Sequence, residues 1–247
     1  MRLKAVNITK TFEETMVLDN VSLVLKEHEF VSIIGPSGCG KSTIFNIISG
    51  LIKPDKGEIF INEENYTGKT ARVSYLPQKD LLLPWKKIID NVSIPLILRG
   101  EGSKTARVKA ATYFDLFGLK GFENKYPFQL SGGMKQRAAL LRTYLFSKDI
   151  MLLDEPFGGL DALTKSKMYL WLKKVTEELE ASVLFITHDI DEAIYLSDRI
   201  YVLSNRPARI VKEVTISLPK IRDKEIITSL EFIEIKKSIL QTISEFI

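Results

Sequence analysis

The sequence predicts an α/β fold with a mainly parallel core sheet, and three observations support this prediction. Short apolar runs of strand length alternate with helical segments along much of the chain, which is typical of a sheet covered by helices. A glycine-rich loop follows one of the buried runs directly and leads into a helical pattern. The 247 residues, of which 45% are hydrophobic and 27% charged, suffice for one large α/β domain or two small ones.

The first third of the chain is predicted to be rich in strands. Turn residues separate its apolar runs, and only the segment 41–49 has helical spacing. The predicted strands cover residues 3–8, 21–25, 30–34, 58–61 and 73–76.

A phosphate-binding loop is predicted between the strand 30–34 and the following helix. The segment matches the pattern G-x-x-x-x-G-K-[ST] in the strand-to-helix context that this pattern requires. Small residues let backbone N–H groups close around a polyphosphate, and the helix adds its positive N-terminal end. Lys41 supplies a charge for the β- and γ-phosphates, and the Ser42 hydroxyl is a candidate Mg²⁺ ligand. The loop consists of Gly35, Pro36, Ser37, Gly38, Cys39, Gly40, Lys41, Ser42 and Thr43.

The middle of the chain is predicted to be helical. Residues 88–98 and 106–117 have apolar residues at helical spacing, and few strand candidates occur in this part. The segment 130–137 begins with Leu-Ser-Gly-Gly, which places Ser131 at the cap of another helix and leaves the backbone donors of Gly132 and Gly133 exposed. The segment is therefore either a second anion site, by the logic of the phosphate loop, or simply a helix start.

Strand patterns return in the second half of the chain, at residues 150–153, 183–187 and 200–203. A helix is predicted among them from apolar residues that lie on one face. These residues are Met168, Leu172, Val175 and Leu179.

Two carboxylates, Asp154 and Glu155, follow the strand at 150–153. A strand of a parallel sheet delivers such residues to the carboxyl edge of the sheet, where ligands bind. Behind a phosphate loop, Asp154 is expected to hold Mg²⁺ through its water shell, and Glu155 is expected to polarise the water that attacks the γ-phosphorus. Taken alone, the pair is equally compatible with a strand that enters a polar turn.

The phosphate loop, the Leu-Ser-Gly-Gly segment and the carboxylate pair, in this order, resemble the ATP-binding cassette family over residues 1–205. The resemblance implies a P-loop NTPase with a mainly parallel core sheet, an antiparallel β subdomain and a helical insert. Residues 1–80 and 147–205 would form the ATP-binding core with the antiparallel β subdomain. Residues 81–146 would form the helical subdomain that carries the signature motif, and residues 206–247 a C-terminal extension that ends in an amphipathic helix.

The resemblance assigns roles to four further residues. Phe12 matches the aromatic residue on which adenine stacks, and Gln78 matches the glutamine that touches Mg²⁺ and the attacking water. Asp161 matches the aspartate of a loop that crosses between subunits, and His188 matches the histidine that contacts the γ-phosphate. The alternatives are a core Phe12, a solvated Gln78, a helix cap at Asp161 and a structural His188. The other histidine, His28, lies in a charged turn and is expected to be solvated.

The resemblance also implies a set of partners. In this family Ser131 and Gly133 of one chain meet the γ-phosphate held by the phosphate loop of another, so we expect ATP as substrate, Mg²⁺ as cofactor and a head-to-tail dimer of two copies. ATP would close this dimer and hydrolysis would reopen it. The ATP contacts from this part of the chain would be Ser131, Gly132, Gly133 and Asp161. No apolar stretch approaches the ~20 residues of a bilayer span, so transport would require separate transmembrane permease subunits and, indirectly, an extracytoplasmic substrate-binding protein.

Three segments, 78–92, 155–164 and 203–210, resemble the importers of nitrate, sulfonates and taurine. Gly159 departs from the alanine expected at its position, which adds backbone freedom without removing a functional group. Trp85 is interpreted either as an anchor for a helix of a membrane subunit or as part of the core of its own domain. A pyrimidine or vitamin precursor is the alternative cargo.

The charge, the cysteine content and the first residues of the chain limit which partners and which cellular location we expect. A net charge of +4 without marked clustering argues against nucleic acid as a partner. The single cysteine, Cys39, excludes an internal disulfide, and we expect it to be a small residue that the phosphate loop accommodates rather than a redox switch. The start of the chain has no apolar stretch typical of secretion, so the expected location is peripheral, on the cytoplasmic face of the cell membrane.

The alternative function is a soluble cassette ATPase that acts on nucleic acid or the ribosome, although such proteins usually carry two cassettes or a long coiled coil. A GTPase or a small-molecule kinase is a further alternative. The segment 124–127 lacks the acidic residue of a guanine-reading motif, which disfavours a GTPase.

The last segment contains Pro207 and Pro219 and then an amphipathic stretch. Its apolar residues have the spacing of one helix face, which is predicted to pack on its own domain rather than on a dedicated partner. These residues are Ile226, Leu230, Ile233, Leu240 and Ile247.

Overall fold

The computed structural model describes residues 2–220 and 222–245 of the chain. The strands are β1 (Leu3–Phe12), β2 (Thr15–Leu25), β3 (Phe30–Ile34), β4 (Lys56–Ile61), β5 (Glu64–Asn65), β6 (Ser74–Leu76), β7 (Ile150–Asp154), β8 (Ser182–Ile186), β9 (Arg199–Leu203) and β10 (Ile210–Thr215). The helices are α1 (Lys41–Ile48), α2 (Ile88–Leu98), α3 (Ser103–Ala111), α4 (Gly132–Phe146), α5 (Ala162–Glu178), α6 (Ile190–Leu196) and α7 (Leu230–Ser244). Two short 3₁₀ helices are η1 (Pro127–Gln129) and η2 (Lys224–Thr228).

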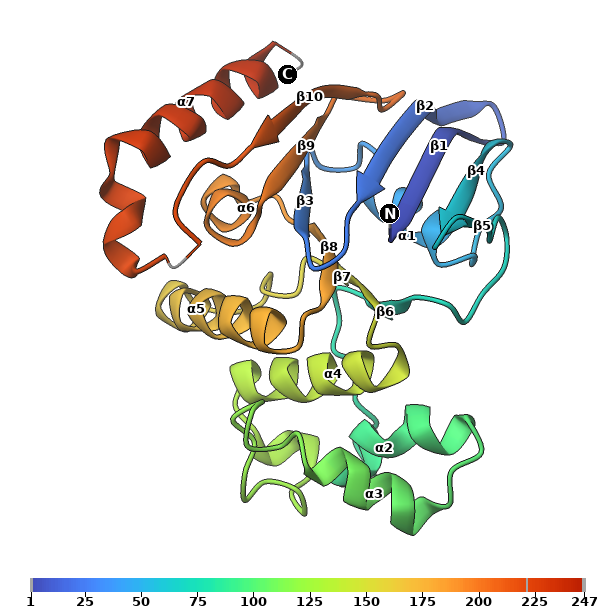
Figure 1. Cartoon of the computed structure of the whole chain (residues 1–247), viewed down its shortest axis with the longest axis vertical. Helices are drawn as coiled ribbons and strands as arrows, with labels where there is room; N and C mark the ends of the chain where they lie inside the picture. Colours follow the sequence, from blue (N-terminus) through green and yellow to red (C-terminus); the bar gives the residue numbers. More distant parts are fainter. Residues whose placement is uncertain (1, 221, 246–247) are drawn as a thin grey trace.

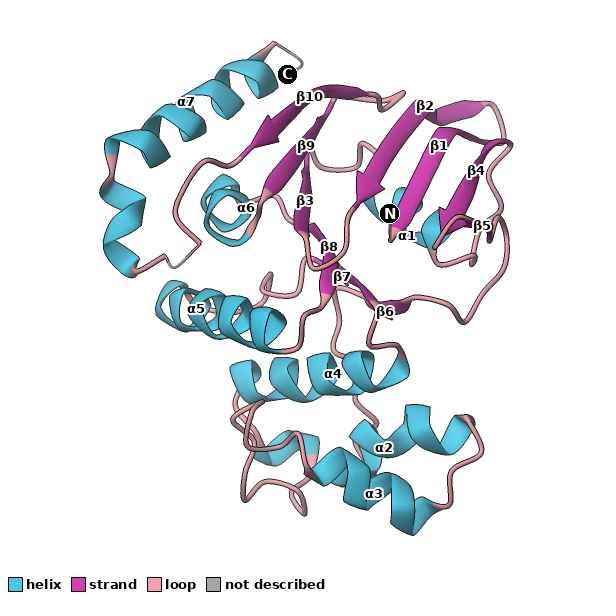
Figure 2. Ribbon diagram, in the orientation of Figure 1, coloured by secondary structure: helices cyan, strands magenta, loops and turns pink. Residues whose placement is uncertain are grey.

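A six-stranded sheet forms the centre of the molecule (Figure 1 and Figure 2). Its strand order is β10-β9-β3-β8-β7-β6, and all neighbours run parallel except the edge strand β10. The strands β3, β7, β8 and β9 are buried at every position, because both faces of the sheet are covered. The sheet confirms the predicted parallel core and brings the ends of β3, β6, β7 and β8 to one edge.

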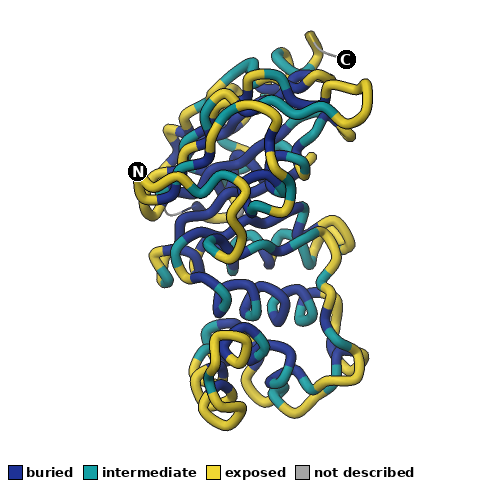
Figure 3. The backbone as a smooth tube through the Cα atoms, turned by 90° about the vertical axis from the view of Figure 1, so that its right-hand side faces the viewer, coloured by how far each residue is buried: buried dark blue, intermediate teal, exposed yellow. Residues whose placement is uncertain are grey.

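A four-stranded antiparallel sheet, β2-β1-β4-β5, covers one side of the central sheet. Helix α1 lies between the two sheets, and its buried residues pack with residues of both in one hydrophobic cluster. The expected antiparallel part of the fold is thus present, and α1 is fixed on both sides directly after the phosphate loop. Figure 3 shows the buried backbone running through these layers and on into α4, with exposed segments at the rim.

Helices α4, α5, α6 and α7 contribute to the cluster on the other face of the central sheet. Helices α2, α3 and α4 form the lower part of the molecule in Figure 1. The helix predicted at 106–117 ends already at Ala111, so that prediction is wrong in its second half. Phe114 and Phe117 are buried from successive turns, whose N–H groups bond locally, as from Phe117 N to Tyr113 O at 3.0 Å. Apolar residues at this spacing indicate which side chains are buried, but successive turns can bury such side chains as well as a helix can.

The chain ends with β10, η2 and α7, and α7 packs beside α6 and β9. The contact face predicted for this helix is wrong. Its exposed apolar residues are Leu230, Ile233 and Leu240. Its buried residues are Phe232 and Ile239. The helix carries apolar residues on two sides, and only one side is covered. Ile226 packs against the core as predicted, and Ile247 lies outside the described residues.

Candidate functional site

The phosphate loop joins β3 to α1 at the carboxyl edge of the central sheet. Helix α1 begins at Lys41 directly after Gly40, and no side chain caps its first turn, which leaves backbone N–H groups for an anion. A Cβ at Gly40 would lie 2.9 Å from two side chains of β2, and the φ of 127° also favours glycine there. The Lys41 ammonium donates to Gly35 O and Pro36 O at 2.9 Å each. The loop therefore holds its lysine with acceptors that phosphate oxygens can replace.

Asp154, at the end of β7, lies beside the first turn of α1. Its carboxylate accepts hydrogen bonds from the Ser42 hydroxyl and from the Tyr75 hydroxyl, the latter at 3.2 Å. Burial raises the pKa of Asp154 above its ordinary value, while these two hydrogen bonds act in the opposite direction. A cation bound beside the ionised carboxylate would offset the effect of burial.

The oxygen donors at this point suit Mg²⁺. The Ser42 hydroxyl and the Asp154 carboxylate face each other, and both are hard oxygen ligands. Within the described ranges, no group of three or more histidine, cysteine, aspartate or glutamate side chains could hold a metal ion.

The three side chains predicted to be catalytic lie together, because Gln78 and His188 both contact one oxygen of the Glu155 carboxylate. Glu155 Oε2 lies 3.1 Å from His188 Nδ1 and accepts a hydrogen bond from Gln78 Nε2 at 3.3 Å. The three residues follow β7, β8 and β6, whose parallel pairing brings their ends together. Glu155 also has a φ of 44°, which is uncommon for a residue with a Cβ and typical of strained functional positions. A carboxylate held in this way can orient a water molecule and accept its proton.

Phe12, at the end of β1, is not part of the core. Its side chain is 41% exposed, and the Lys10 ammonium lies 5.4 Å from the ring centroid. The exposed ring surface is available to a flat ligand such as adenine.

Ser131 caps α4, and its hydroxyl accepts a hydrogen bond from Met134 N at 3.3 Å. The two glycines of the motif are closely packed, because a Cβ at Gly132 would lie 3.2 Å from Leu160 and a Cβ at Gly133 would lie 3.2 Å from the Thr164 side chain. Figure 1 places α4 in the lower part of the molecule and α1 in the upper part beside the antiparallel sheet. Helix α4, which Ser131 caps, is therefore separated from α1, which begins in the phosphate loop of the same chain.

Asp161 caps α5. Its carboxylate accepts from Thr164 N at 3.0 Å and from Thr164 Oγ1 at 2.6 Å, and these hydrogen bonds lower the pKa of Asp161. The helix-cap alternative is thus observed. The carboxylate remains exposed to solvent, so capping leaves it accessible to another chain. His28 is also exposed, although its ring bonds to the backbone oxygen of Glu180.

Two residues of the site were not predicted from the sequence. Tyr75 contacts Asp154 as described above, and Arg206 Nε donates to Gly38 O within the phosphate loop. Arg206 follows β9, whose end lies beside the end of β3, and that position is the one sequence signal for the contact.

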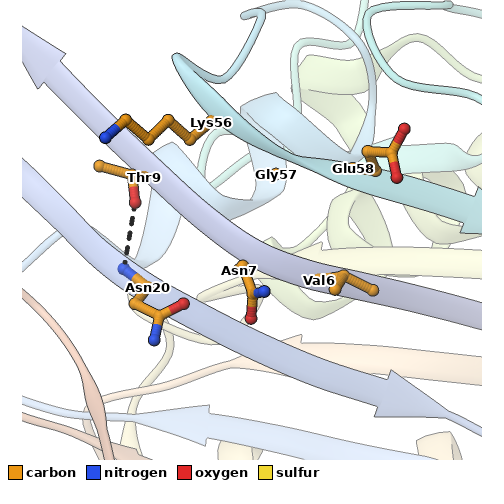
Figure 4. Close-up of a pocket in the computed structure, with 7 residues that line it drawn as sticks. All are labelled: Val6, Asn7, Thr9, Asn20, Lys56, Gly57 and Glu58. Atoms are coloured by element: carbon orange, nitrogen blue, oxygen red, sulfur yellow. Dashed lines mark hydrogen bonds between the residues drawn. The ribbon is translucent and has the colours of Figure 1, made fainter.

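A hollow on the antiparallel sheet is separate from this site (Figure 4). It measures about 540 Å³ and lies over β1, β2 and β4, where the pairing of β1 with β4 shifts between Val6 and Thr9. Its charged residues, Lys56 and Glu58, point away from each other. The lining residues are Val6, Asn7, Thr9, Asn20, Lys56, Gly57 and Glu58. The irregular pairing of the strands accounts for the hollow, and we assign no ligand to it.

The helices of residues 2–220 and 222–245 include none with the length and apolarity needed to cross a membrane.

Comparison with known proteins relates the site to a family. The model of the ABC transporter family matches residues 18–158. The chain is 44% identical over 222 residues to the formylaminopyrimidine import ATP-binding protein ThiZ of Halalkalibacterium halodurans, which covers 87% of this chain and 86% of that protein. It is 41% identical over 233 residues to the aliphatic sulfonates import ATP-binding protein SsuB of Bacillus cereus, with 94% and 90% covered. A solved dimeric ATP-binding cassette in a post-hydrolysis state, bound to ADP and Pi, superposes with a TM-score of 0.73 at 34% identity and covers 88% of this chain and 100% of that chain.

Proposed function

Because this chain belongs to the ABC transporter family and is an ATPase, we propose that it is the ATP-hydrolysing subunit of a membrane importer. The comparisons confirm the predicted family and the predicted P-loop NTPase fold. Two relatives that match most of the chain are named as import ATP-binding proteins, which supports import over action on nucleic acid or the ribosome.

The roles proposed for Glu155, His188 and Gln78 in hydrolysis rest on one observation: Gln78 and His188 both contact the Glu155 carboxylate. Glu155 orients the attacking water and accepts its proton, and His188 and Gln78 hold the carboxylate in place. Lys41 binds the β- and γ-phosphates, and Phe12 stacks on the adenine. Ser42 and Gln78 directly, and Asp154 through water, would hold Mg²⁺, which would supply positive charge against the phosphates.

The proposed working unit is a head-to-tail dimer of two copies. Helix α4, which begins at Gly132 directly after Ser131, lies apart from α1 and the antiparallel sheet in Figure 1, so a second copy would bring Ser131, Gly132 and Gly133 to the ATP. Asp161 lies on the same side, because Leu160 and Thr164 pack against the two glycines. The contacts of Ser131 and Gly133 with the γ-phosphate exist only in the closed pair, so ATP favours closure and hydrolysis removes that preference.

A permease is the proposed membrane partner, and it would hold this chain on the cytoplasmic face of the membrane. A groove of about 430 Å³ lies where α2 and α4 meet the core. Its lining is largely apolar and includes Leu51, Val73, Ile94, Leu98 and Phe146. Trp85, in the preceding loop, is 71% exposed and does not fill its own core. These exposed apolar groups suit a helix presented by a membrane subunit.

The cargo is set by the subunits that surround this ATPase rather than by the ATPase itself. Relatives of nearly equal identity, 44% and 41%, are named for the import of a formylaminopyrimidine and of aliphatic sulfonates. We therefore propose a small polar organic molecule or oxyanion as cargo, which includes sulfonate, taurine or nitrate and the pyrimidine alternative. An extracytoplasmic binding protein would deliver it.

Glu155→Gln tests the proposed mechanism. The amide keeps the shape of the side chain but cannot accept a proton, so we expect ATP turnover to fall by about 10²-fold or more. ATP binding should persist, and the variant should form a stable dimer with ATP in size-exclusion chromatography and small-angle scattering.

Lys41→Ala in the same background is the control for this experiment. Without the lysine the variant should bind ATP weakly and remain monomeric at the same ATP concentration. Unchanged turnover in Glu155→Gln would remove Glu155 from its role, and an ATP-loaded variant that stays monomeric would refute the dimer mechanism.

A further inference from the structure

Glu192 is a buried carboxylate that the mechanism above does not use. It lies on α6 and is 3% exposed, and both of its oxygens have partners. Oε1 accepts from the Tyr169 hydroxyl at 2.6 Å and lies 3.5 Å from the Lys165 ammonium. Oε2 accepts from the Thr187 hydroxyl at 2.5 Å. A carboxylate buried this deeply is retained only where such donors offset the loss of water.

The partners of Glu192 come from two separate parts of the site. Thr187 directly precedes His188, and its hydroxyl also accepts from Asp189 N at 3.0 Å, so this hydroxyl bonds to two residues that follow the histidine, Asp189 and Glu192. Lys165 and Tyr169 lie on α5, whose cap is Asp161. The ring of Tyr169 also packs against the ring of Phe157, which lies in the loop after Glu155, and the two ring centroids are 5.4 Å apart.

We propose that Glu192 is a positioning residue, which ties the loop that carries His188 to the helix that follows Asp161. The proposal rests on the function assigned above to His188. Through this tie the histidine keeps its place at Glu155 while α5 keeps Asp161 facing a second chain. Glu192 makes no contact with the phosphate loop in its hydrogen bonds or ion pairs, so its loss should affect turnover and leave ATP binding intact.

Glu192→Ala is the direct test, measured as the steady-state ATPase activity of the full chain. We expect kcat to fall about 10-fold to 100-fold, because a small displacement of a catalytic group has effects of that size. KM for ATP should stay within about threefold, since Glu192 does not contact the phosphate loop that holds ATP in its own chain. Glu192→Gln keeps the shape and can still bond to both hydroxyls, so it should recover most of the lost kcat. Tyr169→Phe removes one hydrogen bond and should give an intermediate kcat even if Glu192→Ala is poorly folded.

Glu29→Ala is the matched control. Glu29 is also a buried carboxylate, 8% exposed, and it accepts from Arg199 at 2.6 and 3.0 Å. It precedes β3, whereas His188 follows the parallel strand β8, so Glu29 lies at the opposite edge of the sheet. We expect this variant to lose thermal stability while kcat stays within about twofold of the original.

The double variant with His188→Ala separates positioning from general damage. If Glu192 acts through the histidine, Glu192→Ala should change kcat by less than about twofold in the His188→Ala background. A full additional loss in that background, or equal shifts in kcat and KM, would overturn the positioning role. Wild-type kcat in Glu192→Ala together with a reduced kcat in His188→Ala would overturn this inference alone. Wild-type kcat in both would overturn the role assigned to His188 and this inference with it.

Discussion

The thiol of Cys39 lies inside the phosphate loop and is nevertheless shielded from solvent. Its side chain belongs to the core and is 2% exposed. Burial raises the pKa of Cys39 above its ordinary value, although the nearby charges of Lys41 and Arg206 act in the opposite direction. A raised pKa leaves a smaller thiolate fraction at any given pH, and the thiolate is the reactive form.

We therefore predict that Cys39 is inert in the folded protein. Alkylation by iodoacetamide should be at least about tenfold slower than in the protein unfolded in urea at each pH between 7 and 9, because burial limits access to the thiol and the raised pKa leaves less thiolate. Mass spectrometry measures the modified fraction, and Cys39→Ser serves as the blank because the chain has one cysteine. Rapid labelling at pH 7 would contradict the prediction and favour a redox role.

Site residues that form a motif of consecutive positions could be predicted from the sequence. Contacts between residues far apart in the sequence could not. The phosphate loop and the Asp154–Glu155 pair stand out because each occupies consecutive positions after an apolar strand. The hydrogen bond from Gln78 to Glu155 spans 77 positions, so the local pattern cannot contain it. Glu192 left a faint signal, an acidic residue in a largely apolar helix next to His188, but its partners on α5 emerge only from the packing.

At the scale of elements, the buried strands were the easiest to predict. The run 30–34 coincides with β3, because a strand covered on both faces is apolar throughout. The helix predicted at 88–98 coincides with α2, because its buried apolar residues recur at helical spacing. Strand β10 was not predicted. Its positions are only partly buried, and an edge strand therefore leaves a weaker pattern.

Helix α7 shows why a buried face is harder to predict than a helix. Phe232 and Ile239 lie seven positions apart and are both fully buried, while Ile233 and Leu240, also seven apart, are exposed. The two pairs have the same period, so the sequence alone cannot decide between them. The contact with α6 and β9 makes that choice.

The two faces of α7 should differ in their contribution to stability. Phe232→Ala removes a buried ring and should lower the free energy of unfolding by about 3–5 kcal/mol. Ile233→Ala removes a side chain that is 49% exposed, and it should cost less than about 1 kcal/mol. Urea denaturation followed by circular dichroism measures both values. Equal losses, or a larger loss for Ile233→Ala, would mean that α7 packs through the other face.

At the scale of the whole molecule, the fold separates the groups that bind ATP from those that would meet a membrane subunit. The phosphate loop and the carboxylates lie at the edge of the central sheet, and the groove lies where α2 and α4 meet the core. Gln78 connects the two regions, because it follows β6 and precedes the exposed loop that holds Trp85. Gln78 thus lies in the one short segment that separates the two regions in the sequence.

The class of the fold was predictable from the alternation of strands and helices, but its strand order was not. The central strand β3 lies between β8 and β9, which begin 152 and 169 positions after it (182 − 30 and 199 − 30). Such pairing depends on how the layers pack, and no local pattern reports it. The resemblance to a family, rather than periodicity, carried the expectation of a second, antiparallel sheet.

Leu98→Glu tests whether the groove receives the permease. Leu98 is 78% exposed and lines the groove, so a buried charge there should weaken docking strongly. We expect co-purification with the natively expressed membrane subunits to fall about tenfold or more. An unchanged thermal midpoint of the purified chain would show that the fold is intact.

The matched control is Leu230→Glu, which changes a leucine of equal exposure, 79%, at the start of α7. It introduces the same charge at a surface outside the groove, so complex formation should stay at the level of the unmodified chain. Because both variants replace an exposed leucine with glutamate, a difference between them reflects the position of the substitution and not the added charge. If Leu230→Glu releases the permease and Leu98→Glu does not, the membrane subunits dock on the C-terminal helix and the groove has another role.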